Sequence, residues 1–340
     1  MAESSDKFLT RPPLVDSFGR VHSNLRISVT DRCNIRCFYC MPESNVQFLP
    51  RTELLTFEEL TRFVSVVASC GVNKLRLTGG EPLVRSNLSE LVGQLAKIDG
   101  IQDIALTTNG LLLADYAQPL FDAGLHRLNV SLDGLSEATF QKISRRSGLD
   151  KVLAGIDKAI EMGFQKIRLN AVSIAGITEP EIIPLARFAR AKKLELRFIE
   201  FMPLDADKSW ASDQVLSGEK IKAMIESEIG SLVPAERLDK SQPSMDFDFA
   251  DGNGRIGFIN PISQPFCSDC NRIRITAEGK FRNCLFSTSE WDLRKILREG
   301  GTDADIEAAV RDSIGQKKAT HGIDSDAFVR PEKAMFQIGG

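Results

Sequence analysis

The predicted fold starts from one loop, Cys33-Asn34-Ile35-Arg36-Cys37-Phe38-Tyr39-Cys40. It follows Leu25-Arg26-Ile27-Ser28-Val29, in which apolar and polar residues alternate as they do in a half-buried strand. Three thiolates from so short a loop can bind three irons of a cubane iron–sulfur cluster and leave the fourth iron open. The alternative is a zinc site, but structural zinc normally takes four Cys or His ligands, and the spacing of His22 does not recommend it as the fourth.

Composition indicates an ordinary globular protein from a reducing compartment. The 340 residues include 43 Lys and Arg against 46 Asp and Glu, so there is no excess of positive charge for nucleic acid. No apolar run is long enough to span a bilayer, and the first residues lack the apolar core of a signal peptide, so we expect a cytoplasmic protein without a membrane partner. Six of the seven cysteines fall in two groups, which favours metal binding over disulfides, and Cys70 is expected in the core.

Strand and helix patterns alternate from Leu25 to about residue 200. Helical periodicity intervenes between the strands, beginning with a capping box at Thr56–Glu59, and this alternation predicts a parallel α/β sheet. In nearly every strand, alternate residues are apolar and the residues between them are polar; we call these two sets the two parities of the strand. One face of the sheet should therefore pack on helices while the other lines a polar interior. A closed or partial barrel fits this better than a doubly wound sheet. The further strands are predicted at 74–78, 104–109, 127–133, 166–172 and 194–200.

The polar face of these strands is also basic. Converging cations repel one another unless an anion joins them, and Arg is suited to phosphate oxygens, so this face predicts a polyphosphate ligand. The cations on this parity are Arg26, Lys74, Arg76, Arg127, Arg168 and Arg197.

Two further motifs complete the pattern. Thr78-Gly79-Gly80-Glu81-Pro82 ends the second strand with a double glycine, which lets backbone approach a ligand closely. Cys267-Ser268-Asp269-Cys270 and Cys284 form a second set of three cysteines, and His321 is too far along the chain and too isolated to suggest a fourth zinc ligand. This set again favours a cluster with one open iron.

The combined motifs resemble the GTP 3′,8-cyclases of molybdenum cofactor biosynthesis, a family of radical S-adenosylmethionine (AdoMet) enzymes. The resemblance implies an α/β fold, an incomplete (βα)6 TIM-like barrel whose open side is closed by a C-terminal α+β region that carries a second cluster. The barrel would extend over 15–204 and the C-terminal region over 205–340, and we expect a flexible tail over 1–14 because the first residues are polar and include prolines. The segments that carry the resemblance are 14–20, 25–41, 76–85, 107–110, 197–202, 265–274, Cys284 and Gly339-Gly340.

The resemblance implies a lyase that converts GTP to 3′,8-cyclo-7,8-dihydro-GTP through a 5′-deoxyadenosyl radical, the first step of molybdenum cofactor (molybdopterin) biosynthesis. Its cofactors would be AdoMet and two 4Fe–4S clusters, held by Cys33, Cys37 and Cys40 and by Cys267, Cys270 and Cys284. AdoMet would contact Tyr39, Gly79, Gly80, Glu81, Ser131 and Met202. GTP would contact Arg26, Lys74, Arg76, Thr107, Arg168, Arg197, Arg272 and Arg274. The catalytic residues would be Arg272, Arg274, Gly339 and Gly340.

Two arginines depart from the family pattern. Arg168 stands where the family usually carries Lys, which keeps the charge but changes the reach, and Arg127 matches no family role. The partners implied are GTP, AdoMet, an external electron donor and the next enzyme of the pathway, with a homodimer as a candidate assembly. The alternatives are a peptide-modifying radical AdoMet enzyme and a zinc-stabilised nucleic-acid-binding module; the net acidic charge and the βα alternation count against the module.

Overall fold

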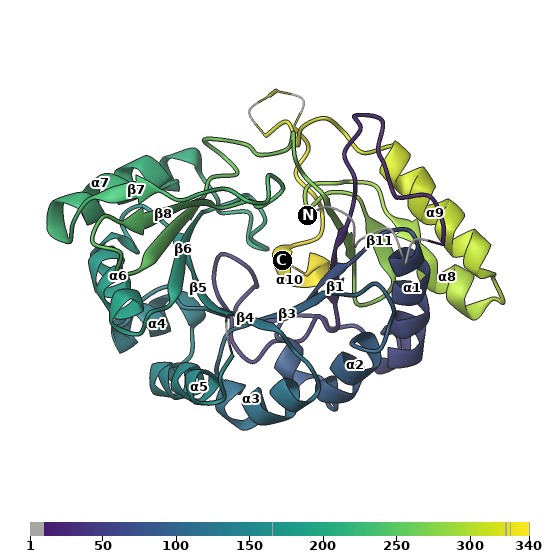
Figure 1. The fold of residues 1–340 in the computed structure, drawn as a ribbon, viewed down its shortest axis with the longest axis horizontal. Coiled ribbons are helices and arrows are strands. Elements are labelled where there is room, and N and C mark those ends of the chain that lie inside the picture. The colour runs from purple at the N-terminus through teal and green to yellow at the C-terminus, as the bar shows by residue number, and fades with distance from the viewer. Residues whose placement is uncertain (1–9, 165, 324, 327, 340) are drawn as a thin grey trace.

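The computed structural model describes residues 10–164, 166–323, 325, 326 and 328–339. Within them the strands form one twelve-stranded sheet in the order β12-β11-β10-β1-β2-β3-β4-β5-β6-β9-β8-β7. Figure 1 shows this sheet curved like a cup, with the helices along its outer side. No strand pairing joins its two edges in this part of the chain, so the barrel is incomplete, as the sequence predicts.

The first six strands are parallel neighbours in chain order, which is what alternating strands and helices dictate. They are β1 (Asn24–Ser28), β2 (Lys74–Thr78), β3 (Asp103–Thr108), β4 (Arg127–Ser131), β5 (Lys166–Ser173) and β6 (Glu195–Glu200). The helices of this part are α1 (Phe57–Ser69), α2 (Leu88–Leu95), α3 (Leu113–Asp122), α4 (Glu137–Ser144), α5 (Leu149–Glu161) and α6 (Ile182–Ala191). All six predicted strands are therefore present, each within two residues of its predicted ends.

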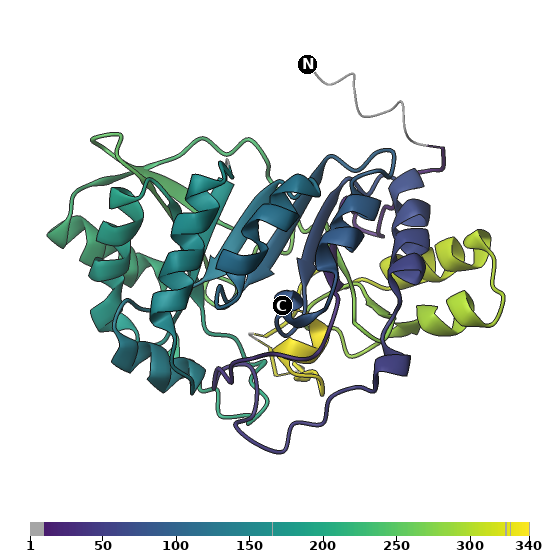
Figure 2. The same ribbon diagram turned by 90° about the horizontal axis from the view of Figure 1, so that it is seen from below.

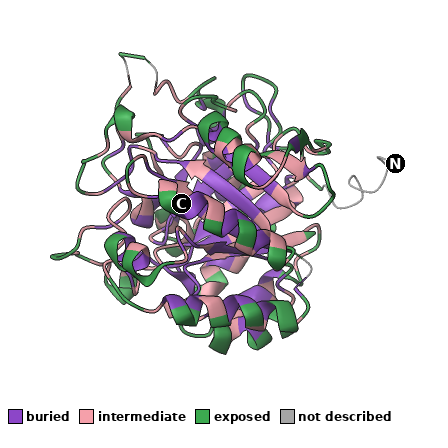
Figure 3. Ribbon diagram, turned by 90° about the vertical axis from the view of Figure 1, so that its left-hand side faces the viewer, coloured by how far each residue is buried: buried purple, intermediate pink, exposed green. Residues whose placement is uncertain are grey.

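The prediction that alternate residues of nearly every strand are apolar and face the core is also confirmed. Leu25, Leu75 and Ile104 lie side by side in the register of β1, β2 and β3, and all three are buried in the core shared with the helices. α1 begins at the predicted capping box, where Thr56 and Glu59 each accept a hydrogen bond from the other's backbone N–H. Figure 2 shows helices lying across the outer face of the sheet, and Figure 3 shows that their outward sides are exposed while the strands behind them are buried.

The C-terminal part of the chain extends the sheet at both edges. β9 pairs in parallel with β6 and β10 in parallel with β1, while β8 with β7 and β11 with β12 continue the two edges in antiparallel pairings. The bounds are β7 (Leu232–Pro234), β8 (Met245–Phe249), β9 (Arg255–Ile259), β10 (Arg272–Ile275), β11 (Lys280–Arg282), β12 (Trp291–Asp292), α7 (Gly218–Glu228), α8 (Leu293–Arg298), α9 (Asp303–Gly315) and α10 (Met335–Ile338). The boundary at residues 204 and 205 stays a prediction.

The last helix, α10, sits inside the cup, over the carboxyl ends of β1 and β2. None of the helices in the described residues is long and apolar enough to cross a membrane.

Candidate active site

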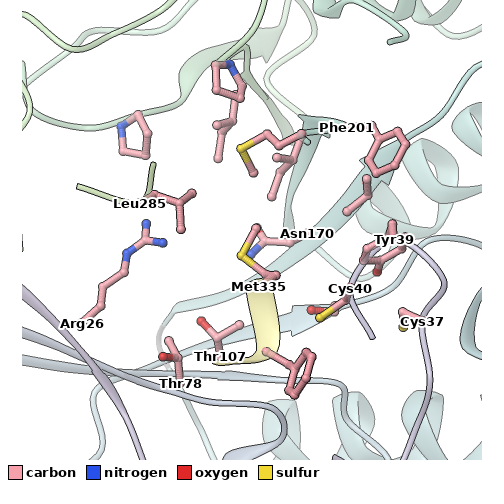
Figure 4. Close-up of a pocket in the computed structure, with 18 of the residues that line it drawn as sticks. Arg26, Cys37, Tyr39, Cys40, Thr78, Thr107, Asn170, Phe201, Leu285 and Met335 are labelled. Carbon is pink, nitrogen blue, oxygen red and sulfur yellow. The ribbon is translucent and has the colours of Figure 1, made fainter. Parts of the chain in front are cut away.

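The concave face of the sheet holds a cavity that both cysteine sets line. In Figure 4, Arg26 and Leu285 lie on one side of this cavity and Cys37, Tyr39 and Cys40 on the other, with Thr107 and Asn170 between them. The cavity therefore joins the two motifs that the sequence places more than two hundred residues apart.

The first cysteine set, Cys33, Cys37 and Cys40, is held by the chain around it. The backbone N–H groups of Arg36 and Phe38 donate to carbonyls at the end of α4, over 2.8 and 3.1 Å. These bonds fix the loop at the carboxyl ends of the strands, above the polar face.

The double glycine explains how this loop is seated. A Cβ at Gly79 would lie 2.4 Å from the carbonyl oxygen of Thr30, and one at Gly80 would lie 2.4 Å from that of Arg32. Gly79 also has a φ of +152°, which side chains rarely adopt. Only glycine therefore lets this segment hydrogen-bond to residues 30–32 and hold the start of the cysteine loop, in addition to its predicted contact with a ligand.

The thiols of this set need a metal to become thiolates. Burial raises the pKa of Cys33 to about 11 and that of Cys40 to about 12, and it raises the pKa of Cys37 well above the ordinary value. A bound metal deprotonates its thiol ligands, so these three side chains fit a cluster better than a catalytic thiolate.

The second cysteine set lies at the other end of the parallel strands. Cys267 and Cys270 precede β10, which runs parallel to β1, and β11 returns antiparallel to β10 and so brings Cys284 back beside them. Burial alone would raise the pKa of Cys270, but the nearby cations of Arg272 and Lys317 outweigh it and lower this pKa to about 6. The local charge thus favours a thiolate at Cys270.

His321 corrects one sequence-based interpretation. His321 is distant from the cysteines in the sequence, yet it lines the same cavity, its backbone hydrogen-bonds to Cys267, and the centroid of its ring lies 5.0 Å from that of Phe286. The chain returns to this site after α9, which sequence distance does not reveal. Among the described residues, no three His, Cys, Asp or Glu side chains are placed to hold a single metal ion.

The predicted basic face is present as a row across neighbouring strands. Arg26 pairs in register with Arg274 on one side and Arg76 on the other. Burial, and then repulsion by neighbouring arginines, lowers the pKa of Arg26 and Arg76 well below the ordinary value. An anion between these side chains would relieve that repulsion.

Several polar atoms of this cavity are buried and have no hydrogen-bond partner within the described residues. They are Nε of Arg26, Oγ1 of Thr107, Oδ1 of Asn170 and Nε of Arg197. Buried polar atoms normally have partners, so this set fits a polar ligand in the cavity.

The predicted GTP residues divide into two groups. Arg26, Arg76, Thr107, Arg197, Arg272 and Arg274 all line the cavity. Lys74 and Arg168 are not among its lining residues: Lys74 pairs with Asp239 over 2.8 Å and Arg168 with Glu195 over 2.5 Å.

Arg127, which belongs to the predicted basic face but matches no family role, makes a two-pronged ion pair with Asp103 on the neighbouring strand β3. Both residues lie near the amino ends of their strands, away from the cysteine loop. This partner identifies Arg127 as a structural cation of the sheet.

All but one of the predicted AdoMet residues line the cavity. Tyr39, Gly79, Gly80, Ser131 and Met202 line the cavity, but Glu81 does not. Glu81 instead accepts hydrogen bonds from the hydroxyl of Thr108 and the backbone of Leu83 and Asn109, and burial raises its pKa to about 7. Its position suits it to bracing the ends of β2 and β3.

Sequence reasoning missed Asp133, which lines the cavity and accepts a 2.7 Å hydrogen bond from the hydroxyl of Tyr39. Asn109 was also missed as a contact of the first set: its side chain lies 3.7 Å from Sγ of Cys33. Asn109 directly follows β3 and Asp133 lies two residues after β4, and these places are the signal that could have found them, because parallel strands present their carboxyl ends to one site.

The end of the chain lies inside the cavity region. Phe336 packs beside Met41 near the first cysteine set, Ile338 packs beside Phe286 near the second, and the carbonyl of Gly339 accepts a 3.0 Å hydrogen bond from Arg274. Gly340 falls outside the described residues, so its predicted role is untested.

Two ion-pair anchors hold this tail. Lys333 pairs with Glu278 and Glu290 over 2.5 and 2.7 Å, and Arg330 pairs with Asp205 over 2.5 Å.

This fold and site define a radical AdoMet protein. The family model of the Radical SAM superfamily matches residues 27–189, and that of Molybdenum Cofactor Synthesis C matches residues 194–323. A GTP 3′,8-cyclase of Rhodopirellula baltica is 53% identical over 330 residues, which cover 96% of this chain and 92% of that protein. A GTP 3′,8-cyclase of Thermodesulfovibrio yellowstonii is 42% identical, covering 96% of this chain and 99% of that one. The chain belongs to the GTP 3′,8-cyclase family.

Solved structures support the fold. Streptococcus suis SuiB bound to S-adenosylmethionine has a TM-score of 0.58 at 15% identity, covering 90% of this chain and 69% of that one. Methylornithine synthase (PylB) has a TM-score of 0.52 at 18% identity, covering 85% and 86%. At such identities the likeness concerns the fold alone, an α/β sheet left open as an incomplete barrel.

Proposed function

We propose that this protein is a radical AdoMet lyase that converts GTP to 3′,8-cyclo-7,8-dihydro-GTP, the first step of molybdenum cofactor biosynthesis. Family membership supports the activity. The observation that carries it in the structure is a single cavity with one cysteine set at each end and a row of arginines between them. That arrangement suits a substrate that carries a charged phosphate chain and that meets a different cysteine-bound group at each end of the cavity.

The two cysteine sets fit two 4Fe–4S clusters. Each offers three thiols to one cavity, and three thiolates leave one iron of a cubane open. Cys33, Cys37 and Cys40 would hold the cluster that binds AdoMet, and Cys267, Cys270 and Cys284 would hold the cluster that faces the guanine. When bound, the first cluster and AdoMet supply the radical that takes hydrogen from C3′ of the GTP ribose, so that C3′ can bond to C8 of the base.

The chain's own residues bind and orient the substrate. Arg26 lies between Arg274 and Arg76 in register, so three guanidinium groups can share the phosphate oxygens of one triphosphate. Arg197 and Thr107 offer unpartnered atoms to the same cavity. The converging positive charge would favour a triphosphate over a neutral nucleoside.

Lys74 and Arg168 would contribute charge from a distance. Each has a carboxylate partner in this structure, Asp239 and Glu195 respectively, so direct contact with GTP would require these ion pairs to open. Arg168 holds Glu195, which lies 3.7 Å from Arg197, so Arg168 can position Arg197 through that shared carboxylate.

AdoMet would contact Tyr39, Gly79, Gly80, Ser131 and Met202. Glu81 would act indirectly, because its hydrogen bonds to Thr108 and Asn109 hold the segment that contains Gly79 and Gly80 in place. Arg272, Arg274 and Gly339 would assist catalysis with Gly340. Phe336 and Ile338 of α10 place apolar side chains between the two cysteine sets, which would help to exclude water from a radical intermediate.

The test is anaerobic reconstitution followed by reaction with GTP, AdoMet and dithionite. We expect about eight irons per chain, GTP-dependent 5′-deoxyadenosine and a product with the mass and NMR spectrum of 3′,8-cyclo-7,8-dihydro-GTP. Cys284→Ala is the matched control, because it should keep the first cluster and lose the second. Zinc without iron, or 5′-deoxyadenosine with no cyclised product from GTP, would contradict the proposal.

The external electron donor, transfer of the product to the next enzyme, a homodimer and a cytoplasmic location are further parts of this proposal. Reduction of the clusters by a purified electron carrier in place of dithionite would test the first. Sedimentation of the reconstituted protein would test the homodimer.

A further inference from the structure

Lys317 is a buried cation that the proposed mechanism does not use. It follows α9 and is only 4% exposed. Its ammonium group donates to the carbonyls of Arg272 and Asn283, each at 2.8 Å, and lies 3.6 Å from Sγ of Cys270. An ammonium group has three N–H donors, so all three are used.

These three acceptors come from both parts of the second cysteine set. Arg272 is two residues after Cys270, and Asn283 directly precedes Cys284. Lys317 therefore ties the CxxC segment to the distant third cysteine and touches one of the sulfurs as well.

A second cation fastens the same loop from the other side. Arg20 donates to the carbonyl of Cys267 at 2.7 Å and to the carbonyls of Lys318 and Ala319 at 2.8 and 3.0 Å. Its Nε pairs with Asp16 at 2.6 Å, and Asp16 also accepts from the backbone of Phe18. This gives a role to the motif at residues 14–20, which carries part of the family resemblance but lies outside the cavity.

We infer that Lys317 is a positioning residue for the second cluster, which holds Cys270 and Cys284 at their binding distance and donates a hydrogen bond to the Cys270 sulfur. Arg20 holds the Cys267 end of the same loop without touching a sulfur. Hydrogen bonds to cluster sulfurs and nearby positive charge raise the reduction potential of an iron–sulfur cluster. Lys317 thus tunes the potential of the second cluster, whereas Arg20 affects only how firmly the cluster is held.

The inference rests on the proposed second cluster, and the experiment isolates that cluster. The first cysteine set is replaced by alanine in the full-length chain, so that about four irons remain and all belong to the second site. Into this background we place Lys317→Met, and Lys318→Met as the matched control. Lys318 is the next residue and carries the same charge, but its side chain is exposed and has no hydrogen bond or ion pair among the described contacts.

We expect Lys317→Met to lower the midpoint potential of the cluster in an EPR-monitored titration and to weaken iron retention against a chelator by about 10–100-fold. Lys318→Met should match the parent in both measurements. Arg20→Met should speed iron loss and leave the midpoint potential close to that of the parent.

Equal midpoint potentials for Lys317→Met, Lys318→Met and the parent would overturn the inference. If Lys317→Met does not fold, Lys317→Gln tests the inference in its place, because it keeps an N–H donor and loses the charge. It should shift the midpoint potential in the same direction by a smaller amount. An unchanged midpoint potential in this variant would also overturn the inference. A parent that binds no iron at the second site would instead refute the proposed function, so the two failures are distinguishable.

Discussion

Replacing Gly339 by alanine should release the C-terminal tail from the cavity. Gly339 has a φ of +81°, and a Cβ there would lie 2.6 Å from Cβ of Ser28 and 2.8 Å from Oγ1 of Thr78. The left-handed backbone costs about 1–2 kcal/mol for a residue with a side chain. Displacing buried neighbours costs about 1–3 kcal/mol more. The sum, about 2–5 kcal/mol, weakens docking of the tail by at least about 30-fold.

Trypsin cleavage after Lys333 measures this docking, because the Lys333 ammonium pairs with Glu278 and Glu290 when the tail is in place. The rate of cleavage follows the population of the open form. Gly176→Ala is the matched control: Gly176 also has a positive φ, +72°, but a Cβ there meets nothing within 4 Å. We expect Gly339→Ala to be cleaved at least about 30-fold faster than the parent and to lose turnover with GTP, while Gly176→Ala matches the parent in both. Equal cleavage rates for the two variants would refute the argument from the close approach of Gly339.

Three further outcomes are expected. Arg76→Gln should weaken GTP binding by about 10–150-fold in calorimetry, because a hydrogen bond to a charged group contributes about 1.5–3 kcal/mol. Arg127→Gln should instead lower the melting temperature and leave the affinity for GTP unchanged. Burial raises the pKa of Glu81 from 4.5 to about 7, so between these pH values the folded state binds more protons than the unfolded state. The free energy of unfolding of the apoprotein should therefore fall by about 3 kcal/mol as the pH rises from about 4.5 to about 7. Urea titrations should show that loss, and Glu81→Gln should flatten it; an equal slope in both proteins would contradict the assignment. Cys70→Ala should keep about eight irons per chain while Cys284→Ala keeps about four, and loss of iron from Cys70→Ala would mean that the buried Cys70 is a ligand after all.

Much of the fold was predictable because its determinants are local. The alternation of apolar and polar residues in β1 and β2 depends on neighbours two positions apart, and the capping box of α1 depends on residues three apart. The spacing of Cys33, Cys37 and Cys40 is likewise contained in one loop. Such local signals can be recognised in the sequence without knowing how distant parts of the chain pack.

The partners of individual charges were not predictable in this way. Arg127 and Arg168 share the polar parity with Arg26, yet only Arg26 lines the cavity, because Asp103 and Glu195 lie beside the other two on adjacent strands. An ion pair across strands depends on register, which the local pattern does not contain.

The sequence by itself therefore determined the class of fold, the two cysteine sets and the basic face, since each depends on short-range spacing. The tertiary structure decided which residues lie beside the cysteine loop at Cys33–Cys40 and beside the second cysteine segment at Cys267–Cys270. It placed β10 and β9 on opposite sides of the six parallel strands, returned the chain after α9 so that Lys317 reaches Cys270, and seated Gly339 against β1 and β2. These contacts join residues far apart in the chain, and only the packed sheet fixes which of them come together.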